Sequence, residues 1–173
     1  LQHPDLHFAF PVTTNDSVKK HPVSNLFLNE WRDFVSNQPY GGLFNWLQSI
    51  GVENKQGMIG VDEALEVVKK LQLKSYEGGF KVMIIWMAEK MNNECANQLL
   101  KLIEEPPEKT VVLLLTENVE IILDTIKSRC TEFKFFFIIS KKKKILKSIF
   151  ELYNVDLNHV DIINNFYFDT PGN

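Results

Sequence analysis

The chain has 173 residues, of which 45% are hydrophobic and 12% aromatic, and its formal net charge is −3. This length fits one domain, or one domain with a fragment of a second, and the apolar content excludes general disorder. The mildly acidic balance excludes a stand-alone basic DNA-binding domain. The two cysteines, Cys95 and Cys130, are too few for a disulfide framework or a zinc module. The longest apolar run, Val82 to Ala88, is too short to cross a bilayer, so we expect no membrane association. Two free thiols fit a reducing compartment, and we therefore expect a cytoplasmic location.

The first half of the sequence predicts one strand followed by helices. A strand is expected over residues 6–10, before Pro11, because the segment alternates and is rich in Phe. Ser24 is a candidate cap for a helix over 26–36. A second short helix is expected over 43–50. The helical spacing of apolar residues then predicts a longer helix over 61–73.

The second half predicts strands that alternate with helices. The continuous apolar run at 81–86 and the run at 111–115 are typical of parallel strands buried on both faces. Between them, Asn92 is expected to cap a helix that Pro106 and Pro107 end. A short helix or two turns over 119–127 and a Phe-rich strand over 131–139 follow. This alternation predicts an α/β domain with a largely parallel sheet.

The character of the sequence changes after Ser140. Four lysines, Lys141 to Lys144, begin a pattern typical of a helix, and a second helical pattern follows Asp156. We therefore predict two parts, a core domain fragment at 1–139 and the first helices of a small helical domain at 140–173.

Three segments in order carry a resemblance to a known family. They are the run Ala96 to Pro107 (ANQLLKLIEEPP), the strand Val112 to Thr116, and the triplet Ser128-Arg129-Cys130. With this ordered run the chain resembles the AAA+ clamp-loader family, and within it the delta-prime-type subunits of bacterial DNA polymerase III. The resemblance implies a P-loop NTPase-like fold, with a five-stranded parallel sheet flanked by helices and followed by a helical lid domain. It also implies a chain truncated at both ends, without the phosphate-loop strand and any zinc module that precedes it.

The resemblance places the Walker B element on the strand at 81–86. An active ATPase carries Asp and Glu directly after the apolar run, for Mg²⁺ and for the attacking water. Here these positions hold Trp86 and Met87, which offer no oxygen ligand. The sequence also contains no Gly-x-x-x-x-Gly-Lys-Ser/Thr phosphate loop. We therefore expect no ATP hydrolysis, no bound cofactor and no metal. Thr116 occupies the γ-phosphate sensor position of the family, and we expect it to cap a turn instead.

The triplet Ser128-Arg129-Cys130 has two interpretations. By resemblance, Arg129 is an arginine finger that reaches the ATP site of a neighbouring subunit, with Ser128 and Cys130 in its motif. The alternative is an arginine near a helix end that bonds to backbone carbonyls. We favour the finger because of the motifs around it, and we expect Cys130 to be a small packed residue.

The resemblance implies a non-catalytic clamp-loader subunit that aids sliding-clamp loading in DNA replication. Its expected partners are the tau/gamma ATPase and delta subunits, with the sliding clamp and primer-template DNA contacted through the assembly. Two alternatives remain. One is an active ATPase of the tau/gamma type, and the other is an unrelated α/β binding module.

Overall fold

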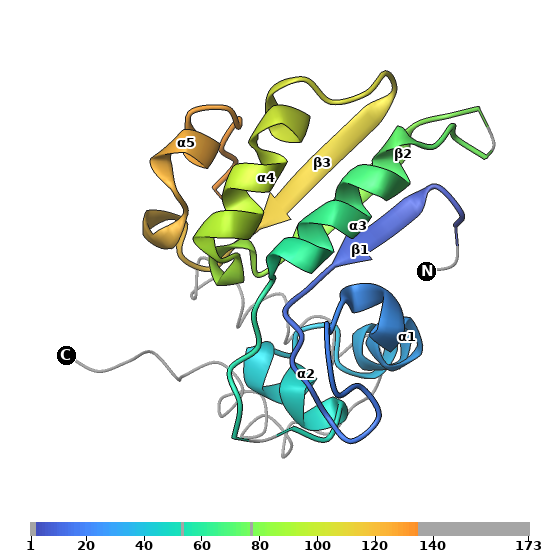
Figure 1. Cartoon of the computed structure of the whole chain (residues 1–173), viewed down its shortest axis with the longest axis vertical. Coiled ribbons are helices and arrows are strands. Elements are labelled where there is room, and N and C mark those ends of the chain that lie inside the picture. The colour runs from blue at the N-terminus through green and yellow to red at the C-terminus, as the bar shows by residue number, and fades with distance from the viewer. Residues whose placement is uncertain (1–2, 53, 77, 135–173) are drawn as a thin grey trace, which may run out of the picture. The chain divides into compact units, whose positions relative to one another are not determined.

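A computed structural model describes residues 3–52, 54–76 and 78–134. Its sheet has three parallel strands in the order β1 (Leu6–Ala9), β2 (Lys81–Trp86) and β3 (Thr110–Leu115), so β2 is central (Figure 1). β2 pairs with β3 along its whole length, from Lys81 opposite Thr110 to Trp86 opposite Leu115. The predicted α/β class with a parallel sheet flanked by helices is confirmed.

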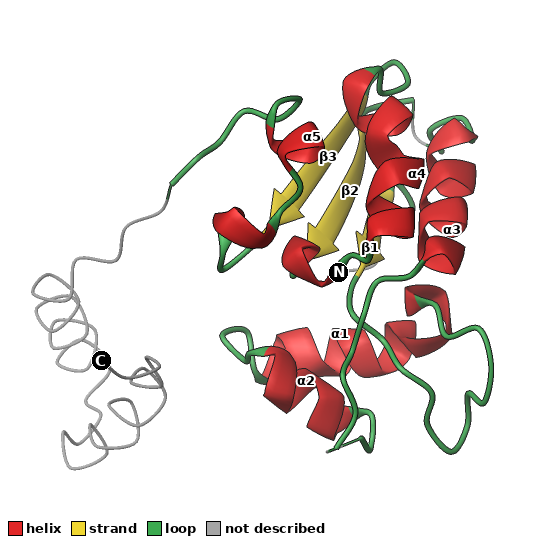
Figure 2. Cartoon of the chain, turned by 60° about the vertical axis from the view of Figure 1, so that its left-hand side comes forward, coloured by secondary structure: helices red, strands yellow, loops and turns green. Residues whose placement is uncertain are grey.

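Five helices and three short 3₁₀ turns connect and cover these strands in the described part of the chain. The helices are α1 (Leu28–Asn37), α2 (Leu43–Ser49), α3 (Val61–Gln72), α4 (Asn93–Glu104) and α5 (Asp124–Lys127), and the turns are η1 (Ser24–Phe27), η2 (Ala88–Lys90) and η3 (Val119–Ile121). α3 and α4 lie side by side on one face of the sheet (Figures 1 and 2). None of these helices has the length and apolar character needed to cross a bilayer.

The elements of the first half agree with prediction except at the start of α1. The predicted helix over 26–36 begins as the turn η1, and the Ser24 side chain caps no helix. Instead, the Ser24 hydroxyl accepts from Phe10 N at 2.8 Å and donates to Phe10 O at 3.1 Å. The capping prediction for Ser24 is wrong because its hydroxyl satisfies the backbone just after β1. Asn92 does cap α4, with its side-chain oxygen accepting from Cys95 N at 2.8 Å.

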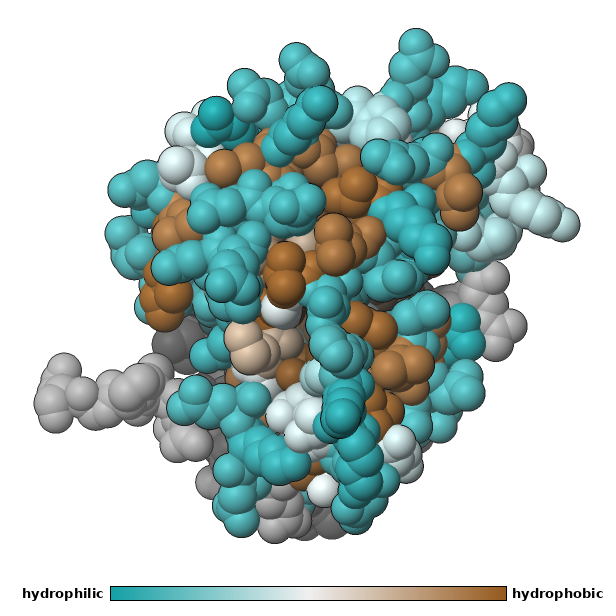
Figure 3. Space-filling model, in the orientation of Figure 1, coloured by the Kyte–Doolittle hydropathy of each residue, from teal (hydrophilic) through white to brown (hydrophobic). Residues whose placement is uncertain are grey.

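The main core lies between the sheet and the pair α3–α4. Met83 and Ile85 of β2 are fully buried there, against buried side chains of both helices that include Leu71 and Leu99. Their neighbours on the strand, Val82 and Ile84, are only half-buried. On the helical face, apolar side chains reach the surface between polar ones (Figure 3).

A second core, rich in aromatic side chains, joins the end of β1 to α1 and α2. Phe10 stacks on Trp31 of α1 with ring centroids 4.2 Å apart, and both rings meet Trp46 of α2 edge-on. The indole N–H of the fully buried Trp46 donates to Pro11 O at 2.7 Å. These contacts fix α1 and α2 against the segment that leaves the carboxyl end of β1.

The prediction that β3 is buried on both faces is wrong. Its side chains alternate, and Val111, Leu113 and Leu115 are 38%, 43% and 46% exposed. β3 is an edge strand among the described residues, and only its face towards α4 is covered. Of the strand predicted over 131–139, residues 131–134 form no strand and the rest lie outside the described residues. The described elements all belong to the compact unit Leu1–Glu132, and the predicted boundary at 139/140 lies outside the described residues.

Two buried ionisable side chains lie at junctions between elements. Lys81, only 5% exposed, donates from Nζ to Leu71 O and, at 2.6 Å, to Leu73 O at the end of α3. A cation is favourable there because the last carbonyls of a helix carry partial negative charge. Glu63, in the first turn of α3, is 1% exposed and accepts from Ser24 N at 2.5 Å through Oε2. Its buried Oε1 has no hydrogen-bond partner among the described residues.

Burial raises the pKa of Glu63 above its usual value, while the hydrogen bond from Ser24 and the charge of Lys70 oppose this shift. The charge of Glu66, one turn away, raises the pKa further. At a pH between the pKa of Glu63 in the unfolded chain and its higher pKa in the folded chain, the folded state therefore keeps a proton that the unfolded state has released. Stability is highest below the unfolded pKa and falls as pH rises through the folded pKa.

Replacing Glu63 with Gln should remove this pH dependence. We expect the wild type to lose stability as the pH rises from the ordinary pKa of a glutamate to the higher pKa of folded Glu63, and Glu63→Gln to show a smaller loss. Urea unfolding at a series of pH values measures the effect. Glu94→Gln, at an exposed position of α4 that does not act on the pKa of Glu63, is the control and should leave the slope unchanged. Parallel stability curves for wild type and Glu63→Gln would contradict the prediction.

Candidate functional site

The carboxyl ends of β2 and β3 lie side by side. Trp86 and Leu115 are paired in register, so Met87 and Thr116 follow at the same edge of the sheet. Ligands of open parallel sheets bind outside this edge. It is the position at which the resemblance places the nucleotide and its Mg²⁺.

Trp86 packs into the aromatic core. Its ring centroid lies 5.1 Å from that of Trp31 and 6.1 Å from that of Phe34, both on α1. The side chain is half-buried and belongs to the layer between the sheet and α1. The position that the resemblance assigns to the first Walker B acid therefore holds a side chain that packs against α1.

Met87 is 4% exposed and has a left-handed backbone, with φ 56° and ψ 54°. A non-glycine residue in this region costs roughly 1–2 kcal/mol, which the burial of the thioether side chain offsets. The turn η2 follows directly, closed by a hydrogen bond from Lys90 N to Met87 O at 2.8 Å. Met87, which the resemblance assigns to the second Walker B acid, thus bends the chain after β2 and is itself buried.

The nearest carboxylate is Glu89, two residues beyond Met87. Its Oε2 is shielded from solvent and has no hydrogen-bond partner in the described part of the chain. Across residues 3–52, 54–76 and 78–134 there is no group of three His, Cys, Asp or Glu side chains able to hold a metal ion. Glu89 alone cannot provide the several oxygen ligands that Mg²⁺ needs.

Thr116 takes part in a local turn after β3. Its hydroxyl oxygen accepts from Asn118 N at 3.1 Å, and the Asn118 side chain accepts from Glu120 N at 3.1 Å. This is the turn-capping contact expected from the sequence. Thr116 is exposed, so this end of β3 places no buried polar side chain at the sheet edge.

Arg129 sits on the turn that ends α5. Its backbone N–H donates to Ile126 O at 3.0 Å, which fixes the start of the side chain. Its Nε donates to Glu104 Oε2 at 3.0 Å, and its Nη1 donates to Thr125 O at 2.9 Å. The side chain is still 33% exposed. Arg129 therefore makes the backbone carbonyl contact expected of an arginine at a helix end, and it also forms an ion pair that the sequence did not reveal.

The two neighbours of Arg129 lie at the surface. The Ser128 hydroxyl donates to Thr125 O at 3.2 Å. Cys130 is exposed, so the prediction of a packed residue is wrong; it follows the end of α5 and enters neither core. Cys95, in α4, is fully buried, and burial raises its pKa to about 12, so this thiol is protonated and unreactive.

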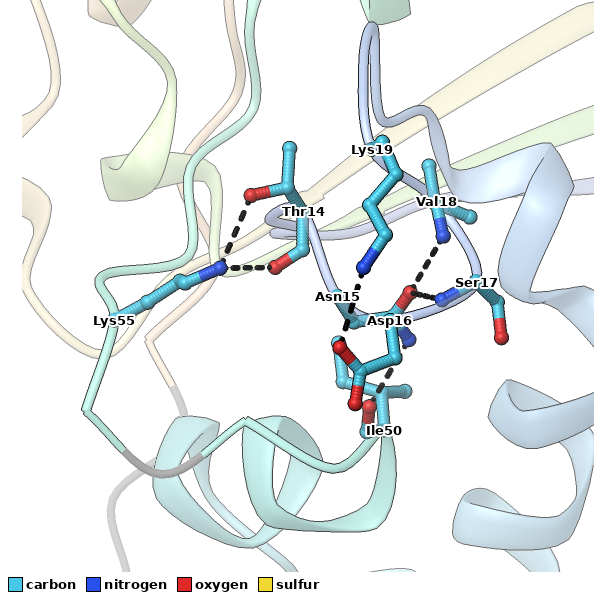
Figure 4. A network of polar contacts seen from close by, with 8 residues as sticks. All are labelled: Thr14, Asn15, Asp16, Ser17, Val18, Lys19, Ile50 and Lys55. Carbon is cyan, nitrogen blue, oxygen red and sulfur yellow. Dashed lines mark hydrogen bonds and ion pairs between the residues drawn. The ribbon is translucent and has the colours of Figure 1, made fainter.

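A polar cavity of about 300 Å³ lies between the loops 14–19 and 51–55. Figure 4 shows the contacts that hold these loops: Lys55 Nζ donates to Thr14 O at 2.8 Å, and Asn15 Nδ2 donates to Ile50 O at 3.1 Å. Lys19 pairs with Asp16 at 3.2 Å. Both lysines are engaged by local partners, so the network serves to close the loops. Sequence reasoning did not find this cavity, because the residues that line it form no motif.

Comparison with known families gives a match over most of the chain. The model of the family described as "DNA polymerase III, delta subunit" matches residues 1–138. The match includes both strand ends described above and the Arg129 turn.

Individual relatives are similar over shorter segments. The DNA polymerase III subunit delta' of Yersinia pestis is 40% identical over 78 residues, which is 45% of this chain and 23% of the relative. The subunit delta' of Escherichia coli K12 is 38% identical over 82 residues, 47% of this chain and 25% of the relative. The DNA polymerase III subunit gamma of Buchnera aphidicola from Acyrthosiphon pisum is 35% identical over 104 residues, 59% and 28% of the two chains. The chain thus spans about a quarter of the length of these relatives.

Among solved structures, the chain is similar to a DNA polymerase III gamma subunit-related protein from Thermotoga maritima. The two are 30% identical, with a TM-score of 0.47 and coverage of 50% of this chain and 29% of the other.

The packing of Trp86 predicts the outcome of restoring an acid at this position. Trp86→Asp should destabilise the fold by about 3 kcal/mol or more, because it removes the ring from the aromatic core and buries part of a carboxylate against Trp31 and Phe34. Trp86→Phe, the control, should cost much less. Urea unfolding measures both. Equal stability of the two variants, together with Mg²⁺ binding by Trp86→Asp, would show that the position is a vacant ligand site.

Proposed function

This chain belongs to the DNA polymerase III delta subunit family, and we propose that it is a delta-prime-type clamp-loader subunit with no ATPase activity of its own. In this role it helps load the sliding clamp onto primer-template DNA in the cytoplasm. Its direct partners are a tau/gamma-type ATPase subunit and a delta subunit. The clamp and the DNA are contacted through the assembly.

The observation that carries this proposal is the packing of Trp86 and Met87. Both positions that require carboxylates in an active ATPase hold apolar side chains: Trp86 packs in the aromatic core, and Met87 is buried at the turn after β2. The fold depends on these two apolar side chains, since Met87 closes the turn after β2 and Trp86 contacts α1. A subunit of this kind can contribute to ATP turnover only through a neighbour.

Arg129 is the residue through which we propose that it does so. Phosphoryl transfer develops charge on the γ-phosphate oxygens, and a guanidinium supplied by a neighbouring subunit stabilises that charge. Arg129 lies at the surface on a hydrogen-bonded turn, with its backbone anchored and its side chain one-third exposed. An arginine finger needs this combination of a fixed backbone and an accessible guanidinium.

The second candidate function is an active ATPase of the tau/gamma type. The similarity to the gamma subunit of Buchnera aphidicola favours it, since that match covers more of this chain than the delta' matches do. The residues at the end of β2 favour the delta-prime role. Membership of the family removes the support for an unrelated α/β binding module.

The subunit should hydrolyse no ATP by itself. Purified protein, incubated with Mg²⁺ and ATP, should show a phosphate release equal to that of buffer, because neither Trp86 nor Met87 can bind the metal or orient water. A Mg²⁺-dependent turnover that copurifies with the chain would favour the tau/gamma alternative.

Arg129→Ala should leave folding and subunit assembly intact but slow the ATP turnover of the reconstituted loader. Arginine fingers contribute about 10³ to 10⁵ in rate in single-site systems, and the loss here should be smaller because other sites keep their own donors. Arg129→Lys should rescue only in part, since an ammonium lacks the forked donors. The measurement is ATP turnover stimulated by clamp and DNA, alongside clamp loading.

Arg32→Ala is the matched control, since Arg32 is the only other arginine in the sequence and its one hydrogen bond among the described residues is to Asn29, at 3.4 Å. It should leave turnover unchanged. Normal turnover and loading with Arg129→Ala would remove Arg129 from the mechanism and return it to a helix-end role.

A further inference from the structure

The ion pair between Arg129 and Glu104 joins the Arg129 turn to the end of α4. Glu104 is the last residue of α4, and its Oε2 accepts from Arg129 Nε at 3.0 Å. α4 is a rigid support, since Asn92 caps its first turn and Leu99 and Leu102 anchor it in the main core. The backbone of Glu104 therefore holds a fixed position relative to the sheet.

A second contact holds the guanidinium from α5. Arg129 Nη1 donates to Thr125 O at 2.9 Å, and α5 is itself anchored by Ile126, which is 1% exposed in the same core. Two supports from different helices thus contact different nitrogens of one guanidinium. Such a pair of contacts restricts the side chain to a small set of rotamers.

The outer part of the guanidinium stays available. An arginine has five N–H donors. In the described part of the chain Nε and Nη1 have partners, and no hydrogen bond is found to Nη2. The inner donors are used to hold the group, while the outer donors can still reach an anion.

Glu104 has no favourable role in α4 itself. A carboxylate at the carboxyl end of a helix is unfavourable, because the last carbonyls already carry partial negative charge. Glu105 places a second carboxylate beside it, and no ion pair of Glu105 is found among the described residues. Among the described residues, the one ion pair found for Glu104 is that with Arg129.

We propose that Glu104 is a positioning residue for Arg129. Its carboxylate holds the Nε–H so that the outer guanidinium donors point towards a γ-phosphate bound on the neighbouring subunit. This inference rests on the proposed function of Arg129. An exposed ion pair contributes little to stability. This one restricts the rotamers of Arg129 beforehand, so less conformational entropy is lost when the guanidinium contacts the phosphate.

The test uses the reconstituted loader with single and double substitutions. Glu104→Gln keeps the size of the side chain and removes its charge, and Glu105→Gln is the matched control on the next residue. We expect Glu104→Gln to lower the kcat of clamp- and DNA-stimulated ATP turnover about two- to fivefold, with KM for ATP unchanged. Glu105→Gln should have no effect.

The double variant shows whether Glu104 acts through Arg129. Glu104→Gln added to Arg129→Ala should slow turnover no further, because the group that it positions is already absent. An additive loss would overturn the inference. So would unchanged turnover with Glu104→Gln alone, or a faster turnover, which would show that the carboxylate restrains Arg129 instead.

Spectroscopy of the 173-residue chain tests the contact itself. With two arginines, a ¹⁵N-labelled sample has two Nε–H groups, and Arg129→Ala assigns them. Glu104→Gln should shift the Arg129 signal, and Glu105→Gln should not. An unshifted signal overturns the inference.

These experiments distinguish failure of the proposed function of Arg129 from failure of the inference about Glu104. Normal turnover with Arg129→Ala overturns the proposed function and this inference together. Slow turnover with Arg129→Ala but normal turnover with Glu104→Gln overturns only the inference.

Discussion

The pairing of β2 on both of its edges is the constraint on which the rest of the structure depends. β2 is the only strand of the described sheet with two neighbours, β1 and β3. One of its faces supplies Met83 and Ile85 to the core under α3 and α4, and Trp86 contributes to the aromatic core with α1. Its first residue, Lys81, also caps the end of α3. Both cores therefore meet at this strand.

The residues that follow β2 are constrained by the same packing. In an ATPase this strand end carries two carboxylates that must face water, metal and phosphate. Here Trp86 and Met87 face protein, and one carboxylate oxygen of Glu89, Oε2, is shielded from solvent without a hydrogen-bond partner among the described residues. The polar side chain to which we assign a function lies elsewhere: Arg129 is held at the surface by contacts with α4 and α5. Loss of the first site and retention of the second are the two halves of the proposed role.

The sequence predicted local patterns well and spatial contacts poorly. β2 has the predicted bounds, and α4 begins after the predicted cap, because an apolar run and an Asn cap act within a few residues. The strand at 110–115 is as apolar as β2, yet one of its faces is exposed, since burial depends on what covers a strand. Ser24 was misassigned because Phe10, 14 residues away, takes its hydroxyl. Glu104 and Arg129 are 25 residues apart, so no local pattern links them, although both belong to the motifs that carried the resemblance.

The most direct measurement of the central claim is a cryo-EM structure of the assembled loader bound to Mg²⁺ and a transition-state analogue of ATP hydrolysis. We predict that Arg129 lies within about 3 Å of the γ-phosphate mimic on the neighbouring subunit, with Glu104 still paired to Nε. We also predict that no metal is bound at the sheet edge beside Trp86 and Met87. An Arg129 side chain that remains in solvent, far from every nucleotide, would contradict the claim.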